Sequence, residues 1–287
     1  MDPMVHVDEA VYPTLTMLGD PLGLGRTAEV FARGDDEVIK LLRPGFPDRL
    51  GEHEAMVAAR VADASVGAPR FLGTTRIEGR LGLVYERLRG PSMLERVVRH
   101  PWEIDRRARQ FAGLHAAVHL ANGTGLPDQK AEVRRMIERA GASLPADARE
   151  AALARLDALP DGAAICHGDM HPGNVLVTAS GPVVIDWETA SRGDPAGDVA
   201  RTLFLMHDGG IPAFLPRVQR RLTVFAKGRF ASVYLREYRR LRRMDDRDVA
   251  AWRLLILAAR LGEEIEDERA HLQVLIRREI DLAGATR

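Results

Sequence analysis

Two acids and an amide lie near the middle of the chain, each at the edge of a short apolar run. Asp169 and Asn174 are five residues apart, and Asp186 follows Asn174 by twelve residues. Magnesium prefers hard oxygen ligands and usually takes one or two carboxylates from a protein, with phosphates and water completing its shell. Asn174 and Asp186 therefore suit a magnesium ion on a nucleotide, and Asp169 is left to accept a proton from an attacking hydroxyl.

A lysine near the N-terminus could serve the same nucleotide. Lys40 is one of three lysines in a chain with 41 lysine and arginine residues. A compact ammonium differs from a planar guanidinium, so a lysine kept among arginines indicates a role that arginine cannot fill. Such a lysine needs an acid to hold its side chain, and we expect Glu54 on the following helix to be that acid.

The elements that must position these residues can be read from hydrophobic periodicity. Alternation and turn signals predict a five-stranded antiparallel sheet with one inserted helix over 48–64. The glycine loop, with Gly23, Gly25 and Ala28, joins two strands, which excludes a dinucleotide-binding βαβ unit because there the glycines open a helix. The predicted strands are 12–19, 29–33, 38–42, 69–75 and 81–88.

Helical periodicity dominates after Pro91, where we place the boundary between two lobes. Residues 1–90 are predicted to form a nucleotide-binding lobe and residues 91–287 a catalytic and substrate-binding helical lobe. Short strands and a loop are expected over 164–186, around the acids. The predicted helices are 92–99, 103–122, 130–143, 147–158, 196–208, 213–226, 229–243, 246–260 and 262–283.

The acid-bearing segment resembles a known signature. His-Gly-Asp-Met-His-Pro-Gly-Asn at 167–174, followed by Ile-Asp-Trp at 185–187, is similar to the motif of the aminoglycoside phosphotransferase and choline kinase-like superfamily. The kinase catalytic loop also spaces its Asp and Asn by five residues. Lys40, Glu54 and a hinge-like segment at 85–88 follow in the expected order, so the resemblance covers most of the chain. It implies an α+β, bilobal, protein-kinase-like fold.

The resemblance also implies a role for each group. ATP is the expected phosphoryl donor, with GTP as the alternative, and Mg²⁺ is the expected cofactor. Asp169 would be the catalytic base, Asn174 and Asp186 the magnesium ligands, and Lys40 with Glu54 the phosphate lysine and its partner. Ala28 replaces a third loop glycine, so backbone amides are the expected phosphate donors there. The predicted backbone contacts are Leu24, Gly25, Arg26 and Thr27 for phosphate, and Glu86, Arg87 and Leu88 for adenine.

The implied reaction is ATP-dependent phosphorylation of a hydroxyl on a small molecule. The expected acceptor is an aminoglycoside-like antibiotic, with resistance as the consequence. Choline, ethanolamine, homoserine, a sugar or a nucleoside-type antibiotic remain alternatives. A nucleotide-binding pseudokinase would need a reason that the sequence does not give, because every catalytic position is filled. A metal-dependent hydrolase is disfavoured, because no further His or Asp stands at metal-ligand spacing.

Composition limits the remaining classes. Hydrophobic residues make up 46% and charged residues 29%, which is typical of a folded globular chain. Net charge is zero and no apolar run approaches the roughly 18 residues that cross a bilayer, so neither nucleic acid nor membrane is an expected partner. One cysteine, Cys166, excludes an internal disulfide framework. We expect a cytoplasmic protein, either a monomer or a homodimer.

Three other groups have structural interpretations. His115 and His119 are one helical turn apart and are expected in the core or behind the site, and Asp198, by the resemblance, bonds the backbone of the catalytic loop. His167 and His171 are four residues apart, which would suit two zinc ligands on a helix. Pro172 and Gly173 follow them, and strands and a loop are expected there, so a zinc site is disfavoured. The acids of 263–268 form either a solvated face or a patch for a polycation, and ion pairs with the arginines of 236–243 would neutralise them.

Overall fold

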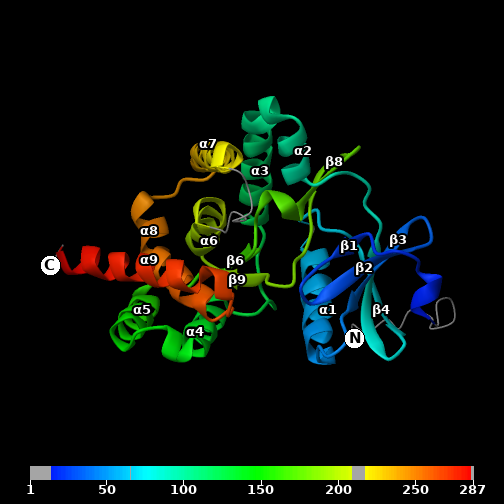
Figure 1. The fold of residues 1–287 in the computed structure, drawn as a ribbon, viewed down its shortest axis with the longest axis horizontal. Coiled ribbons are helices and arrows are strands. Elements are labelled where there is room, and N and C mark those ends of the chain that lie inside the picture. The colour runs from blue at the N-terminus through cyan, green and yellow to red at the C-terminus, as the bar shows by residue number, and fades with distance from the viewer. Residues whose placement is uncertain (1–13, 65, 209–216, 286–287) are drawn as a thin grey trace. The chain divides into compact units, whose positions relative to one another are not determined.

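The computed structural model describes residues 14–64, 66–208 and 217–285, and the chain forms two compact units. The first unit is Met1–Arg96 with Gly173–Thr189, and the second is Val97–Pro172 with Ala190–Arg287. The predicted α+β, bilobal fold is confirmed, with a small antiparallel sheet and a larger, mainly helical part (Figure 1).

The first unit is built on a five-stranded sheet with the order β1-β2-β3-β5-β4. Every neighbouring pair is antiparallel, and helix α1 (Asp48–Asp63) packs against β4 and β5 (Figure 1). Alternation along β3 puts Ile39 and Leu41 on one face and Lys40 and Leu42 on the other. The strands are β1 (Gly23–Leu24), β2 (Ala28–Arg33), β3 (Glu37–Leu42), β4 (Phe71–Ile77) and β5 (Arg80–Glu86).

The face of β3 that carries Lys40 is the face covered by α1. The helix approaches closely at Gly51, where a Cβ would lie 2.7 Å from the Leu81 side chain and 3.2 Å from the Leu42 side chain. Ile39 and Leu41 instead join Leu18, Phe31, Ile77 and Val84 in a separate apolar cluster. The sheet therefore turns Lys40 toward α1, which is the helix that carries Glu54.

The first predicted strand, over 12–19, is wrong. Residues 12 and 13 lie outside the described residues, and Leu15–Met17 form a short 3-10 helix. The fifth strand comes instead from the glycine loop, where Gly23 and Leu24 pair with Val30 and Glu29. A strand of two residues has no alternation to detect, which is why periodicity did not find it.

The first unit also holds the segment around Asn174 and Asp186. Strands β7 (Val175–Thr178) and β8 (Gly181–Val184) form an antiparallel hairpin. The amide of Val177 donates to the Pro91 carbonyl over 2.9 Å, which attaches this hairpin to the segment before α2 (Met93–Arg99). The assignment of 1–90 to the nucleotide and 91–287 to catalysis stays a prediction.

The second unit is a set of helices around two short strands, β6 (Ala164–Cys166) and β9 (Ser191–Gly193), which pair antiparallel. One large core of this unit includes the fully buried Trp252. Aromatic rings of α3 and α7, including Phe111, Tyr234 and Tyr238, make a second buried group. The longer helices are α3 (Ile104–Val118), α4 (Gln129–Arg139), α5 (Ala146–Ala158), α6 (Pro195–His207), α7 (Arg217–Leu241), α8 (Asp246–Leu261) and α9 (Glu266–Ala285).

Two predictions for this unit differ from the structure. The helices expected over 213–226 and 229–243 are one helix, α7, within the described residues, while 213–216 lie outside them. The helix continues through Gly228, which lies between the two predicted ranges, because one glycine costs only about 1 kcal/mol in a helix. Strand β9 was not predicted, since three residues are too few to show a period.

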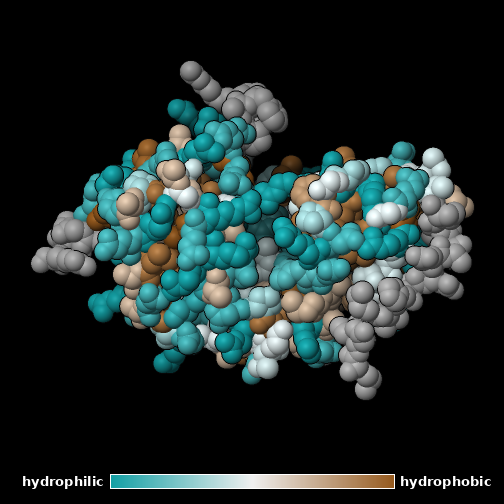
Figure 2. Space-filling view, turned by 90° about the horizontal axis from the view of Figure 1, so that it is seen from below, coloured by the Kyte–Doolittle hydropathy of each residue, from teal (hydrophilic) through white to brown (hydrophobic). Residues whose placement is uncertain are grey.

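The surface fits the charged composition. The face drawn in Figure 2 is mainly hydrophilic, with apolar residues in smaller separate areas. Among the described residues, no helix combines the length and the apolar character that crossing a membrane requires.

Candidate active site

Lys40 is the centre of an acidic cluster in the first unit. Its Nζ donates to Glu54 Oε1 at 2.9 Å, to Asp186 Oδ1 at 2.7 Å and to Glu188 Oε2 at 3.2 Å. Glu54 is buried, whereas Glu52 on the same helix is exposed. Three carboxylates therefore surround the ammonium of Lys40 on β3: Glu54 comes from α1, and Asp186 and Glu188 come from the segment after β8.

The electrostatics of this cluster keep Lys40 charged. Burial lowers the pKa of Lys40, but Glu54, Asp186 and Glu188 outweigh it and raise that pKa well above its usual value. Burial raises the pKa of Glu54, while Lys40 lowers it, with a net rise. The Tyr85 hydroxyl also donates to Glu54 Oε1 at 3.2 Å, so the buried carboxylate has two partners.

Asp186 has an unusual backbone. Its φ is +64°, in the left-handed region that residues other than glycine seldom adopt. Such conformations cost of the order of 1–3 kcal/mol and are kept where the surroundings require them. The amide of Ile185, just before it, donates to the Asn174 carbonyl over 2.9 Å. This bond connects the two residues predicted to bind magnesium.

Glu188 is the site residue that the sequence interpretation missed. Ligand oxygens of Glu54, Asp186 and Glu188 lie within 4.8 Å of one another. Carboxylate oxygens this close suit a hard divalent cation. No regular period relates the two side chains, because Asp186 has a left-handed backbone and Glu188 lies in the turn that follows it.

Some backbone amides of the glycine loop and of the hinge-like segment already donate hydrogen bonds to carbonyl groups of the protein. Gly25 N donates to Ala28 O over 2.9 Å, so this amide is engaged within the loop. Glu86 N donates to Arg70 O over 3.0 Å, and Arg87 N donates to Asp36 O over 2.7 Å. Contacts of Leu24, Arg26 and Thr27 with phosphate, and of the hinge-like segment with adenine, stay predictions.

Asp169 lies in the second unit, in the loop after β6. Gly168 immediately before it has φ +79°, a conformation that glycine adopts without strain. Asp169 N donates to His167 Nδ1 over 3.2 Å, and Asp169 Oδ2 lies 3.5 Å from His171 Nε2. Both histidines therefore contact Asp169, and they are not arranged as a zinc pair. The Asp169 side chain is 32% exposed, which leaves it open to an acceptor.

The surroundings of Asp169 are positive. Burial raises the pKa of this carboxyl group, but the hydrogen bond and charge of His171, followed by the charges of Arg201 and His167, lower it to about 2. Asp169 is therefore ionised at neutral pH. A carboxylate in this form can accept a hydrogen bond from a hydroxyl, and the role of Asp169 as a base stays a prediction.

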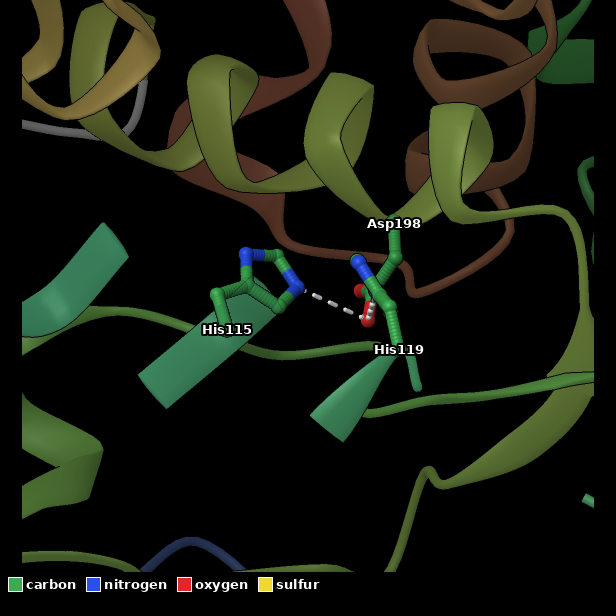
Figure 3. Close-up of side chains that lie close together, drawn as sticks. All are labelled: His115, His119 and Asp198. Atoms are coloured by element: carbon green, nitrogen blue, oxygen red, sulfur yellow. Dashed lines mark hydrogen bonds and ion pairs between the residues drawn. The ribbon is translucent and has the colours of Figure 1, made fainter. Parts of the chain in front are cut away.

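A buried network supports the loop that carries Asp169. Asp198, near the start of α6, accepts hydrogen bonds from the backbone amides of His167 and Gly168. It also accepts from His115 Nε2 at 3.1 Å and His119 Nε2 at 3.2 Å, and Figure 3 shows both rings from α3 pointing at this carboxylate. The carboxylate of Asp198 thus fixes the loop backbone from behind.

The second ring nitrogen of each histidine in this network also has a hydrogen-bond partner. His115 Nδ1 lies 2.8 Å from the Tyr234 hydroxyl, and His119 Nδ1 lies 2.6 Å from the Tyr238 hydroxyl. If each Nε2 donates to Asp198, each Nδ1 accepts from a tyrosine, so neutral rings satisfy every group. Burial, followed by the neighbouring His115, lowers the pKa of His119 to about 4. This completed hydrogen bonding indicates a structural network, although the same three residues have the types that bind metals.

The structure thus brings Lys40, Glu54 and Asp186 together in the first unit and adds Glu188 to them. Asn174, buried in a 3-10 turn, is joined to this set through the backbone. Asp169 belongs to the second unit, with its own set of positive neighbours. The chain passes between the units at Pro172 and Gly173, inside the predicted motif.

The chain also resembles known proteins in sequence and in fold. The sequence model of the phosphotransferase enzyme family matches residues 19–233. A search of curated protein sequences gives no match. Among solved structures, the chain is similar to an amicoumacin kinase in complex with AMP-PNP, Ca²⁺ and amicoumacin, with 15% identity and a TM-score of 0.60 over 94% of this chain and 89% of that one.

Two further solved structures share the fold. An aminoglycoside-3'-phosphotransferase of type VIII has 22% identity and a TM-score of 0.53 over 83% of this chain and 90% of that one. A macrolide 2'-phosphotransferase from Brachybacterium faecium has 20% identity and a TM-score of 0.50 over 90% of each chain. At these identities the likeness establishes the fold and leaves the acceptor open.

Proposed function

The chain belongs to the phosphotransferase enzyme family, and from this we propose that it transfers the γ-phosphoryl group of ATP to a hydroxyl of a small molecule. The observation that carries the proposal is the Lys40 cluster, in which a charged ammonium is held by Glu54 on one side and Asp186 on the other. This arrangement suits an ammonium that contacts nucleotide phosphates, because phosphoryl transfer depends mainly on positioning and charge neutralisation.

In the proposed reaction, the acceptor oxygen forms a bond to the γ-phosphorus. The bond from that phosphorus to the bridging oxygen breaks, and its electron pair leaves on ADP. The hydroxyl proton passes to Asp169 and then to solvent. Because the pKa of Asp169 is about 2, the carboxylate first orients the hydroxyl and takes the proton late, when the new bond is largely formed.

Magnesium fits the acidic cluster. Three carboxylates face one lysine there, so the cluster has an excess of negative charge that a divalent cation would balance. Asp186 with Asn174 and Glu188 are the residues that would hold the ion. When bound, magnesium neutralises the charge that develops on the phosphate oxygens.

For the acceptor, we propose first an aminoglycoside-like antibiotic, with resistance as the consequence. Solved structures named as aminoglycoside and macrolide phosphotransferases and as an amicoumacin kinase support an acceptor of antibiotic type. A metabolite with a hydroxyl group is the second candidate. The observation that favours it is the positive environment of Asp169, because an aminoglycoside carries several ammonium groups.

A phosphorylation screen tests the proposal. Aminoglycosides, macrolides, choline, ethanolamine, homoserine, sugars and nucleosides would each be incubated with magnesium and either ATP or GTP, and the products weighed by mass spectrometry. We expect one acceptor class to gain a phosphoryl group with equimolar release of ADP. Tight binding of ATP without transfer to any acceptor would contradict a kinase and favour a nucleotide-binding regulator.

A cytoplasmic location and a monomeric or dimeric state complete the proposal.

A further inference from the structure

One edge of α7 is exposed along almost the whole helix. Residues at helical spacing share one side of a helix, and those on this edge are all exposed: Val218, Leu222, Phe225, Arg229, Arg236 and Arg240. The side chains of Val218, Leu222 and Phe225 are 71%, 63% and 73% exposed. This set, the α7 edge, therefore has an apolar half near the start of the helix and a basic half toward its end.

The apolar half is accompanied by an exposed indole ring. Helices α3 and α7 pack against each other (Figure 1), and Arg229 is ion-paired with Asp105 in the first turn of α3. Trp102, three residues before Asp105, is 77% exposed, and Phe225 precedes Arg229 by four residues. Both exposed rings therefore lie at the same end of this helix pair. Single exposed apolar residues are common, but a group of them indicates a binding surface.

Helix α7 also carries a strong positive charge. It has eight basic residues and one acidic residue, although the formal net charge of the chain is zero. Ion pairs within the described residues engage three of its arginines, namely Arg229 with Asp105, Arg239 with Asp246 and Arg240 with Glu237. Within that same part of the chain, three other arginines have no carboxylate at ion-pair distance: Arg220, Arg221 and Arg236.

The acids of 263–268 do not neutralise this charge. The sequence suggested that they pair with the arginines of 236–243 or bind a polycation. Four of them have other partners among the described residues: Glu263 and Glu268 pair with Arg260, Glu264 with Arg139 and Glu266 with Arg269. The α7 edge therefore keeps an excess of positive charge, which the net charge of the whole chain conceals.

We infer that the α7 edge binds the surface of a membrane that contains anionic lipids. In the bound state, Leu222 and Phe225 enter the boundary between headgroups and acyl chains, and the exposed arginines meet the lipid phosphates. Aromatic rings such as that of Trp102 are favoured at the depth of the headgroups. A nucleic acid would engage the arginines but would leave the aliphatic side chains of Val218 and Leu222 in water, so a lipid surface fits both halves of the edge better.

Flotation with vesicles tests the lipid requirement. The full chain would be mixed with vesicles of phosphatidylcholine, alone or with an equal part of phosphatidylglycerol, at low and at high salt. We expect flotation with the anionic vesicles, weaker flotation at high salt because salt screens exposed charges, and none with phosphatidylcholine alone. Tryptophan emission should also shift to shorter wavelength on binding, because Trp102 is exposed whereas Trp187 and Trp252 are buried.

Substitutions in each half of the edge give the second arm. Leu222→Ser with Phe225→Ser should weaken binding to the anionic vesicles roughly 10- to 100-fold, because two apolar side chains no longer leave water. Arg236→Gln with Arg240→Gln should weaken it roughly 10- to 30-fold, because two positive charges are lost near the anionic surface.

Matched controls come from other exposed helix faces. Val274→Ser with Leu282→Ser removes two exposed apolar side chains of α9. Arg135→Gln with Arg269→Gln removes two arginines that, like Arg240, pair with an acid three residues earlier. Both controls should bind as the wild type does. Thermal unfolding would confirm that each variant is folded, and Phe225→Ala alone would replace the double apolar variant if that variant does not fold.

The remaining outcomes would overturn the inference. Equal flotation with both kinds of vesicle, no flotation, or equal losses in the control and α7 variants would each do so. Stronger binding to poly(U) than to anionic vesicles, unchanged by Leu222→Ser with Phe225→Ser, would favour a nucleic acid instead. Dimerisation without flotation, abolished by the same double variant in sedimentation velocity, would favour a second copy of the chain. Phosphoryl transfer is measured separately, so the proposed function does not depend on these results.

Discussion

Lys40 and Asp169 have surroundings of opposite charge. In the first unit, three carboxylates surround the single ammonium of Lys40. In the second unit, His171 and Arg201 are the positive neighbours of the single carboxylate of Asp169. The first region has an excess of acid, which the proposed magnesium ion would balance. In the second region, the hydrogen bond and charge of His171 and the charge of Arg201 stabilise the ionised form of Asp169, while Arg201 is itself paired with Glu263.

The regions also differ in what supports them. Lys40 is held directly by Glu54 and Asp186, so its position depends on ion pairs. Asp169 is held indirectly, because Asp198 fixes the loop backbone. A substitution near Lys40 should therefore change activity more than stability. A substitution in the network behind Asp169 should change stability as well.

Asp198→Ala is the largest expected change and tests whether the second region depends on its buried network. It removes the shared acceptor of His115, His119 and two backbone amides, and loss of one member of a buried charged group typically costs about 3–5 kcal/mol. Urea unfolding would measure the free energy of unfolding. Asp105→Ala, which breaks a surface ion pair, is the control and should cost less than about 1 kcal/mol. Equal losses in both variants would show that the network has no special role.

Lys40→Met tests the first region. Removing a donor that neutralises developing charge typically lowers kcat by about 10²–10³-fold. Lys40→Arg should fail to restore activity, because a guanidinium does not have the compact shape of an ammonium. Steady-state kinetics with ATP would measure both variants. Lys130→Met, which removes a lysine paired with Asp161, is the control and should retain activity. Full activity of Lys40→Met would exclude a phosphate role for this lysine.

The pH dependence of stability tests the network further. The folded pKa of His119 is about 4, below its usual 6.5, because burial and then His115 disfavour its charged form. The unfolded chain therefore binds the proton more readily, and stability present above pH 6.5 is lost as pH falls toward 4, by roughly 3 kcal/mol. Tm measured between pH 7 and 4 should fall, and it should fall less in His119→Gln. Parallel curves would contradict a neutral His119.

Tyr234→Phe should give the smallest change of this series. It leaves His115 Nδ1 buried without its hydroxyl partner, which costs about 1 kcal/mol or somewhat more. Thermal unfolding would measure the loss. Tyr85→Phe is a counterpart in the first region, where the Tyr85 hydroxyl donates to Glu54, and it should alter the KM for ATP more than Tm. The reverse pattern would contradict the contrast between the two regions.

The sequence predicted the helices and strands that are long enough to show a hydrophobic period. Helix α1 shows a clear helical period, and the strands around Lys40 show clear alternation. Glu54 was identified from the apolar side of its helix. Strand β1 was missed because two residues show no alternation, and the helices predicted over 213–226 and 229–243 are one helix, α7, within the described residues.

The site was predictable in part. The motif identified Asp169, Asn174 and Asp186 by resemblance, but their roles stay predictions. Glu188 was missed because it lies in a turn after the left-handed Asp186, where no regular period brings the two side chains together.

The most direct test of the account compares wild type with Asp169→Asn once an acceptor is identified. The measurements are acceptor-dependent release of ADP at saturating magnesium and ATP, and the affinity for ATP. We predict a kcat lower by about 10²–10⁴-fold with unchanged nucleotide affinity, because the amide cannot take the hydroxyl proton. A kcat within a few-fold of wild type would contradict Asp169 as the base, and with it the central claim.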